Sequence, residues 1–68
     1  MITMRDRFRC VKSNGSVEKK EVVEVKEVRT QQNAANAIVL EVIEGPRLGH
    51  QLTCGKYFVE EYFEKVAN

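Results

Sequence analysis

The chain has few of the residues that mark several common classes of small protein. It contains no tryptophan, one proline, one histidine and two cysteines among its 68 residues. Two cysteines are too few for the disulfide framework of a small secreted protein, and with a single histidine they cannot complete a four-ligand zinc site without carboxylates. We therefore expect no metal and no cofactor, and we expect Cys10 and Cys54 to be reduced, buried side chains.

Long apolar runs and a large net charge are also missing. No run approaches the about 20 apolar residues that span a bilayer, and the first residues do not form the apolar region of a signal peptide. A net charge of +1 argues against a generic basic nucleic-acid binder. We expect a cytoplasmic protein that does not bind membranes and that folds as a single domain over residues 1–68.

The N-terminal segment "MRDRFRCVKS" alternates with the period of a half-buried strand. Apolar side chains share one face and arginines share the other: Met4, Phe8 and Cys10 against Arg5, Arg7 and Arg9. Asp6 falls on the apolar face, so we expect regular pairing to begin after it. Asn14-Gly15 then predicts a turn, because both residues tolerate positive φ.

Two further segments have the composition of strands. In "EKKEVVEVKEVRT" the β-branched valines favour a strand over a helix, with Val23 and Val25 on one face. Val28 is out of phase with them, and a bulge near Lys26-Glu27 would correct the register. The stretch "AIVLEVIE" is the most hydrophobic in the chain and predicts the central strand, whose core-facing residues are Ile38, Leu40 and Val42.

The stretch "VIEGPRLGHQL" predicts a hairpin that connects two core strands. Pro46 fixes φ at the second position of a tight turn, and Gly45 and Gly49 allow the chain to reverse around it. The following "GHQLTC" resumes the alternation of a strand.

The last segment, "KYFVEEYFEKVAN", predicts a short amphipathic helix. Val59, Tyr62, Phe63 and Val66 recur in it at helical spacing. Four strands, short turns and a terminal helix predict a mainly β domain with a small, strongly bent antiparallel sheet. Our first choice is an SH3-like barrel that the C-terminal helix closes at one end.

The order of segments resembles a group of small SH3-like proteins. "FRCVKS", "KKEVVEV", a glycine-containing hairpin and "KYFVEEYFEKV" follow one another as in the SH3-like accessory proteins that are common in phage genomes. The resemblance spans most of the chain and rests on the pattern of its segments. It implies a genetic context, that of mobile elements, rather than an activity.

The hairpin segment also resembles the KOW motif of transcription-elongation factors and ribosomal proteins. In that motif an apolar strand runs into Gly-Pro, and a second strand follows a further glycine. The resemblance implies contact with RNA, ribosomal protein or RNA polymerase. It makes Gly45, Pro46 and Gly49 the residues that shape the loop and Arg47 and His50 its exposed contacts.

Binding is a better-supported prediction than catalysis. No spacing pairs His50, the one histidine, with either cysteine in a known catalytic signature, so we expect no enzyme. Arg5, Arg7 and Arg9 would project from one strand face about 6.6–6.8 Å apart and contact carboxylate or phosphate groups. Alternatively, they form a solvated face that pairs with glutamates of the neighbouring strand.

We expect a non-enzymatic protein-interaction module, an accessory factor of the phage type that binds and modulates a larger host or viral protein. Its contacts would be the arginine face and the hairpin from Gly45 to His50, and the chain itself would be a monomer or a weak homodimer. The alternative is a KOW-like module that contacts nucleic acid in transcription or translation.

Overall fold

The computed structural model describes residues 1–66, and these form a mainly β structure with one short helix. The elements, in chain order, are β1 (Arg7–Cys10), β2 (Val22–Val28), β3 (Ile38–Glu44), β4 (Gln51–Cys54), α1 (Lys56–Tyr62) and β5 (Phe63–Val66). All strand pairs are antiparallel. The prediction of a mainly β fold with an antiparallel sheet is confirmed.

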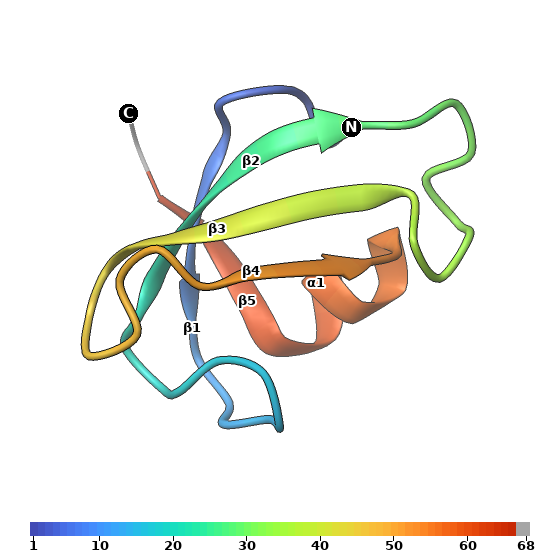
Figure 1. The fold of residues 1–68 in the computed structure, drawn as a ribbon. Coiled ribbons are helices and arrows are strands. Elements are labelled where there is room, and N and C mark those ends of the chain that lie inside the picture. The colour runs from blue at the N-terminus through green and yellow to red at the C-terminus, as the bar shows by residue number, and fades with distance from the viewer. Residues whose placement is uncertain (67–68) are drawn as a thin grey trace.

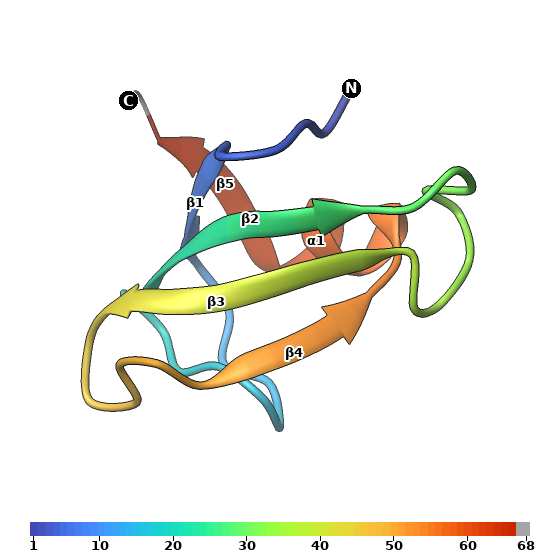
Figure 2. The ribbon, with the colours of Figure 1, turned by 45° about the horizontal axis from the view of Figure 1, so that its top comes forward.

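The five strands form one sheet in the order β4-β3-β2-β1-β5, so the first and last strands lie side by side (Figure 1). Figure 2 shows that the sheet bends strongly, because β1 and β5 run at a steep angle to β2, β3 and β4. Within residues 1–66 no ladder joins β4 to β5, which are the two edge strands. The sheet is therefore open, and the predicted barrel closure is not confirmed.

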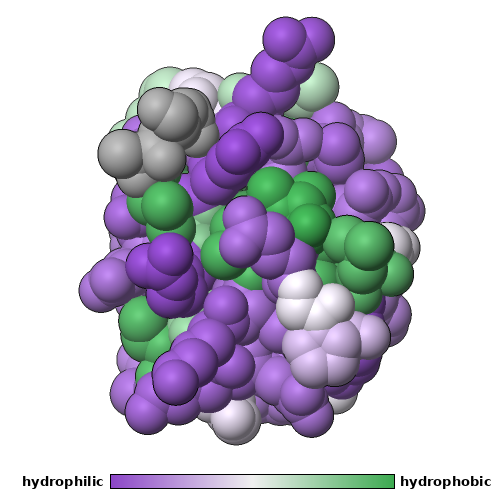
Figure 3. All heavy atoms as spheres, turned by 90° about the vertical axis from the view of Figure 1, so that its left-hand side faces the viewer, coloured by the Kyte–Doolittle hydropathy of each residue, from purple (hydrophilic) through white to green (hydrophobic). Residues whose placement is uncertain are grey.

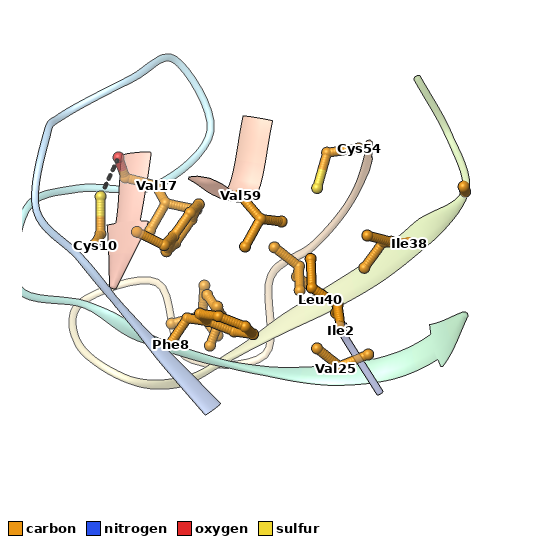
Figure 4. Packing of buried hydrophobic residues seen from close by; sticks show 13 residues of the cluster. Ile2, Phe8, Cys10, Val17, Val25, Ile38, Leu40, Cys54 and Val59 are labelled. Carbon is orange, nitrogen blue, oxygen red and sulfur yellow. Dashed lines mark hydrogen bonds between the residues drawn. The ribbon is translucent and has the colours of Figure 1, made fainter. Parts of the chain in front are cut away.

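The core lies on the inner side of the bend and draws on every strand and on the helix (Figure 4). Ile38, Leu40 and Val42 are completely buried, as their alternation predicts. Each fully buried aliphatic side chain contributes roughly 1.5–3 kcal/mol, which a chain this short needs because it has little interior. Val17, in the loop between β1 and β2, is also completely buried, so this loop is part of the core structure.

Two irregularities adjust the register between β2 and β3. Val25 pairs with Leu40 and Glu27 with Val39, so Lys26 is an extra residue on β2 and the predicted bulge is confirmed. A second shift lies between Val22 and Val23, and no sequence pattern indicated it. Bulges increase the local twist, which suits a sheet that must bend around a small core.

The C-terminal segment differs from the predicted helix. Helix α1 ends at Tyr62, and Phe63–Val66 forms β5, which pairs with β1 through Cys10↔Phe63 and Arg7↔Val66. Strand β1 has one edge that β2 leaves unpaired, and a strand satisfies its backbone groups better than a helix does. The helical spacing of apolar residues therefore did not distinguish a helix from a strand here, because Phe63 is buried in β5 just as it would be in the predicted helix. Residues 67–68 of the predicted helix lie outside the described residues.

The residues before β1 also differ in part from prediction. Met4 is 56% exposed, not buried, because the chain turns before the strand begins, and Arg5 adopts a φ of 70° there. The Asp6 carboxylate accepts the backbone N–H of Thr3 at 3.0 Å, which lowers the pKa of Asp6 despite its burial. Pairing begins at Arg7, as the misplaced charge of Asp6 predicted.

The role of β5 in stability can be measured with one substitution. Phe63→Ala should cost about 3–5 kcal/mol, because it removes a buried ring and leaves a cavity beneath β1. Total stability of a domain is about 5–15 kcal/mol, and a chain this short lies near the lower end, so this loss should remove a large part of its stability. The measurement is urea unfolding followed by far-ultraviolet circular dichroism.

The matched control for this experiment is Tyr57→Ala. It removes another aromatic ring of the same segment, but one that is largely exposed, and should change stability by less than about 0.5 kcal/mol. Equal effects of the two substitutions would contradict the assignment of Phe63 to the core.

Candidate functional site

The β3–β4 hairpin closes with a tight turn whose geometry follows from its glycines and proline. The Leu48 N–H donates to the Gly45 carbonyl at 3.2 Å, which places Pro46 at the second position of the turn, as predicted. Gly45 and Gly49 have φ values of 128° and 90°, a region that L side chains rarely adopt. The three loop-shaping residues thus have the conformations that their types favour.

A buried carboxylate from another loop binds the backbone of this hairpin. Glu21, in the loop before β2, is only 1% exposed, and its Oε2 accepts the backbone N–H of Arg47 at 2.9 Å. Its Oε1 accepts the N–H of Glu18 at 2.7 Å and lies 3.4 Å from Arg47 Nε. A Cβ at Gly45 would lie 2.5 Å from Glu21 Cγ, so the side chain packs directly on the glycine. We call these contacts the Glu21 clamp.

The charge state of Glu21 follows from its surroundings. Burial raises the pKa of the carboxyl group, but the two backbone donors, Glu18 and Arg47, and the Arg47 guanidinium outweigh burial and hold it below its ordinary value. Glu21 is therefore a carboxylate at neutral pH. A buried charge of this kind is tolerated because its oxygens are hydrogen-bonded and a cation lies beside them.

The clamp changes the roles expected in the hairpin. Arg47, predicted to be an exposed contact, is only partly exposed and engages Glu21, whereas His50 is exposed as predicted. Leu48, at the tip, is 69% exposed. Figure 3 views the molecule from the side on which this turn lies in Figure 1, and there hydrophilic side chains surround small apolar areas.

Sequence reasoning missed Glu21 and Leu48. Glu21 stands in a run of charges that is typical of a solvated segment, and no spacing links it to Arg47, which lies 26 residues away. Leu48 had a detectable signal, because an apolar residue inside a Gly-Pro turn has no core to enter. That signal was overlooked in favour of the charged neighbours.

The arginine face is the second predicted site. Arg7 and Arg9 lie exposed on β1, and Arg5 lies exposed in the turn before it. Arg7 Nε lies 3.3 Å from a carboxylate oxygen of Glu24 on β2, and Lys26 Nζ lies 2.7 Å from the other oxygen. The expected alternative, pairing with glutamates of the neighbouring strand, is therefore confirmed for Arg7.

The two thiols lie in the core. Burial raises the pKa of Cys54 to about 11, and burial is also the main cause that raises the pKa of Cys10. Cys10 Sγ donates to the Lys12 carbonyl at 2.9 Å, and Figure 4 shows its longer contact with the Val17 carbonyl. Thiolates are the nucleophilic form, so both groups are poor nucleophiles at neutral pH.

Residues 1–66 contain no group of three or more His, Cys, Asp or Glu side chains arranged to hold a metal ion. The helix in this part of the chain is too short and too polar to cross a membrane. Comparison of the chain with protein-family models, with curated proteins and with solved structures finds no match.

The Glu21 clamp should make stability depend on pH. Because the pKa of Glu21 is lower in the folded chain, the carboxylate contributes stability above its unfolded pKa of roughly 4.3 and loses it as pH falls through the folded value. Glu21→Gln should cost about 1–3 kcal/mol at pH 7, since the amide cannot satisfy both donors and the cation. The difference between the two proteins should shrink as pH falls from about 5 to 3.

Urea unfolding at several pH values measures this difference. Glu44→Gln is the control, because Glu44 is exposed at the end of β3, and it should change stability by less than about 0.5 kcal/mol. A difference between wild type and Glu21→Gln that stays constant down to pH 3 would contradict the clamp.

Both thiols should be protected in the folded protein. We expect 5,5′-dithiobis(2-nitrobenzoate) to react with neither cysteine within minutes at pH 8, and with both in urea, because burial excludes the reagent and disfavours the thiolate. Rapid release of the chromophore by the folded protein would show that at least one thiol is accessible.

Proposed function

We propose that this protein is a non-enzymatic protein-interaction module, an accessory factor of the phage type that binds and modulates a larger protein. It contacts its partner through the hairpin tip, with Leu48, Arg47 and His50, and through the arginine face. We also propose that its bent sheet belongs to the SH3-like class. The strong bend and the adjacency of the first and last strands support this classification.

The observation that carries the proposal is a largely exposed leucine on a turn that is held in place. Leu48 stands between the clamped Arg47 and Gly49, and His50 N–H donates to the Arg47 carbonyl at 2.9 Å. A loop that is already ordered loses little conformational entropy on binding, so more of the contact energy appears as affinity. An apolar tip with a polar rim matches the anatomy of protein–protein interfaces.

The charges around the arginines favour protein over nucleic acid as the partner. Arg7 is engaged by Glu24, and Glu64 lies opposite Arg9 on β5. Carboxylates at these positions repel phosphates and reduce the counterion release that drives binding to nucleic acid. A protein surface with charges of both signs complements such a face better.

The test is a comparison of two tagged baits in cell lysate, each with and without nuclease. Leu48→Asp changes the hairpin tip, and Tyr57→Asp makes the same change at an exposed aromatic residue on α1. We expect wild type and Tyr57→Asp to retain one stoichiometric protein after nuclease treatment, and Leu48→Asp to lose at least about nine-tenths of it. Circular dichroism of the three baits is the control that each of them is folded.

Three outcomes would overturn the proposal. Recovery that disappears with nuclease would favour the KOW-like alternative, in which the module contacts nucleic acid. Equal retention by both variants would remove the hairpin tip as the contact. Absence of any stoichiometric partner of the wild-type bait would remove the protein-interaction function itself.

A further inference from the structure

The two edge strands of the sheet differ in how they resist pairing with another strand. β5 carries Lys65 on the same face as the buried Phe63, and Glu64 on the other face. Charged side chains on an edge strand, above all inward-facing ones, oppose the addition of a further strand. β4 has neither a charge nor a proline, and it pairs with β3 in unbroken register. Figure 2 shows β4 at the margin of the sheet, so β4 is the unprotected edge.

The hydrogen bonds of the β3–β4 ladder determine which backbone groups of β4 point away from β3. The Val42 N–H donates to the His50 carbonyl at 2.9 Å. Hydrogen-bonded and non-hydrogen-bonded pairs alternate along an antiparallel ladder, so the next residues of β4 that bond to β3 are Leu52 and Cys54. The two remaining residues of β4 point their N–H and C=O groups toward the open edge.

These two residues, Gln51 and Thr53, each present a donor and an acceptor at the edge. Within residues 1–66 no group bonds to their backbone N–H or C=O. The two residues are about 6.8 Å apart along the strand, a spacing that an extended chain repeats at every second residue. The unpaired groups therefore specify an extended backbone as the ligand, as in other cases of strand addition.

We infer that the β4 edge binds an extended segment of another protein, which pairs with β4 as a further strand of the sheet. Backbone hydrogen bonds to Gln51 and Thr53 hold the segment, and its side chains alternate between the two faces of the sheet. On the inner face they lie beside Leu52, which packs against the core and is partly exposed. An apolar side chain at this position shields Leu52 from water.

The outer face selects the other set of side chains of the segment. On this face the Gln51 side-chain amide donates to a carboxylate oxygen of Glu41 at 2.9 Å. Strands β3 and β4 contain no lysine or arginine, whereas Glu41 and Glu44 both lie on β3. Long basic side chains that extend across Gln51 complement this acidic side of the sheet. The segment that fits the β4 edge therefore alternates apolar with basic residues.

The shortness of β4 limits the strength of binding. Two residues with free backbone groups make few hydrogen bonds, so we expect a dissociation constant on the order of 100 µM. The inference goes beyond the proposed function, because this edge is separate from the hairpin tip and the arginine face. Leu48→Asp should therefore bind the peptide described below within about twofold of wild type, even where it loses its partner in lysate.

The probe is a synthetic peptide, acetyl-Lys-Val-Lys-Val-Lys-Val-Lys-amide, and the readout is amide exchange with water followed by NMR. In the free protein the Gln51 and Thr53 amides should exchange fast and those of Leu52 and Cys54 slowly. With about 2 mM peptide the Gln51 and Thr53 amides should exchange at least about fivefold more slowly, because they donate to the peptide. A control peptide with proline in place of its central valine has the same charge but lacks a donor for the ladder, and should leave both rates within about twofold.

Two substitutions at one position test the edge by a second route. Thr53→Pro removes an N–H that faces the open edge, a position where proline is tolerated, and should weaken peptide binding at least about fivefold. Thr53→Val keeps the N–H and the β-branched shape, and should bind within about twofold of wild type. The exchange measurement on the wild type decides the inference even where Thr53→Pro does not fold.

Three results would overturn the inference. The first is unchanged exchange of the Gln51 and Thr53 amides in the presence of the peptide. The second is equal protection by the proline-containing control, which would show that charge alone attracts the peptide. The third is loss of peptide binding in Leu48→Asp, which would place the contact at the hairpin tip instead of the β4 edge.

Discussion

A single buried carboxylate connects two segments of this molecule that lie far apart in the sequence. Glu21 lies in the loop between β1 and β2, yet it bonds the backbone of Arg47 in the hairpin between β3 and β4. It also packs directly on Gly45, where a Cβ would lie 2.5 Å from Glu21 Cγ. Leu48 is 69% exposed at the tip of this turn, and Glu21 holds the turn in place.

The outer face of the sheet follows a different principle, because its charges are arranged by strand register rather than by burial. Pairing places Arg9 of β1 opposite Glu64 of β5, and Arg7 of β1 opposite Glu24 of β2. Charges of both signs therefore alternate across this face. Such a face attracts a uniformly charged polymer such as nucleic acid less strongly than a purely basic face would.

Much of the fold could be predicted from the sequence, because period-two alternation and turn chemistry are local. The central strand, the Gly-Pro hairpin and the bulge at Lys26 are confirmed. The last strand was missed because Phe63 and Val66 fit a helix equally well, and only the free edge of β1 decides between the two. Glu21 was beyond prediction for a similar reason: its burial depends on a hairpin 26 residues away.

Amide hydrogen exchange followed by NMR tests most directly whether Glu21 holds the hairpin in an ordered conformation. At neutral pH we expect the Arg47 amide of the wild type to exchange about as slowly as the amides of β3, and at least about tenfold faster in Glu21→Gln, because the hydrogen bond to the carboxylate would be weakened. An Arg47 amide that exchanges in the wild type at the rate of an open loop would show that Glu21 does not hold the hairpin in place.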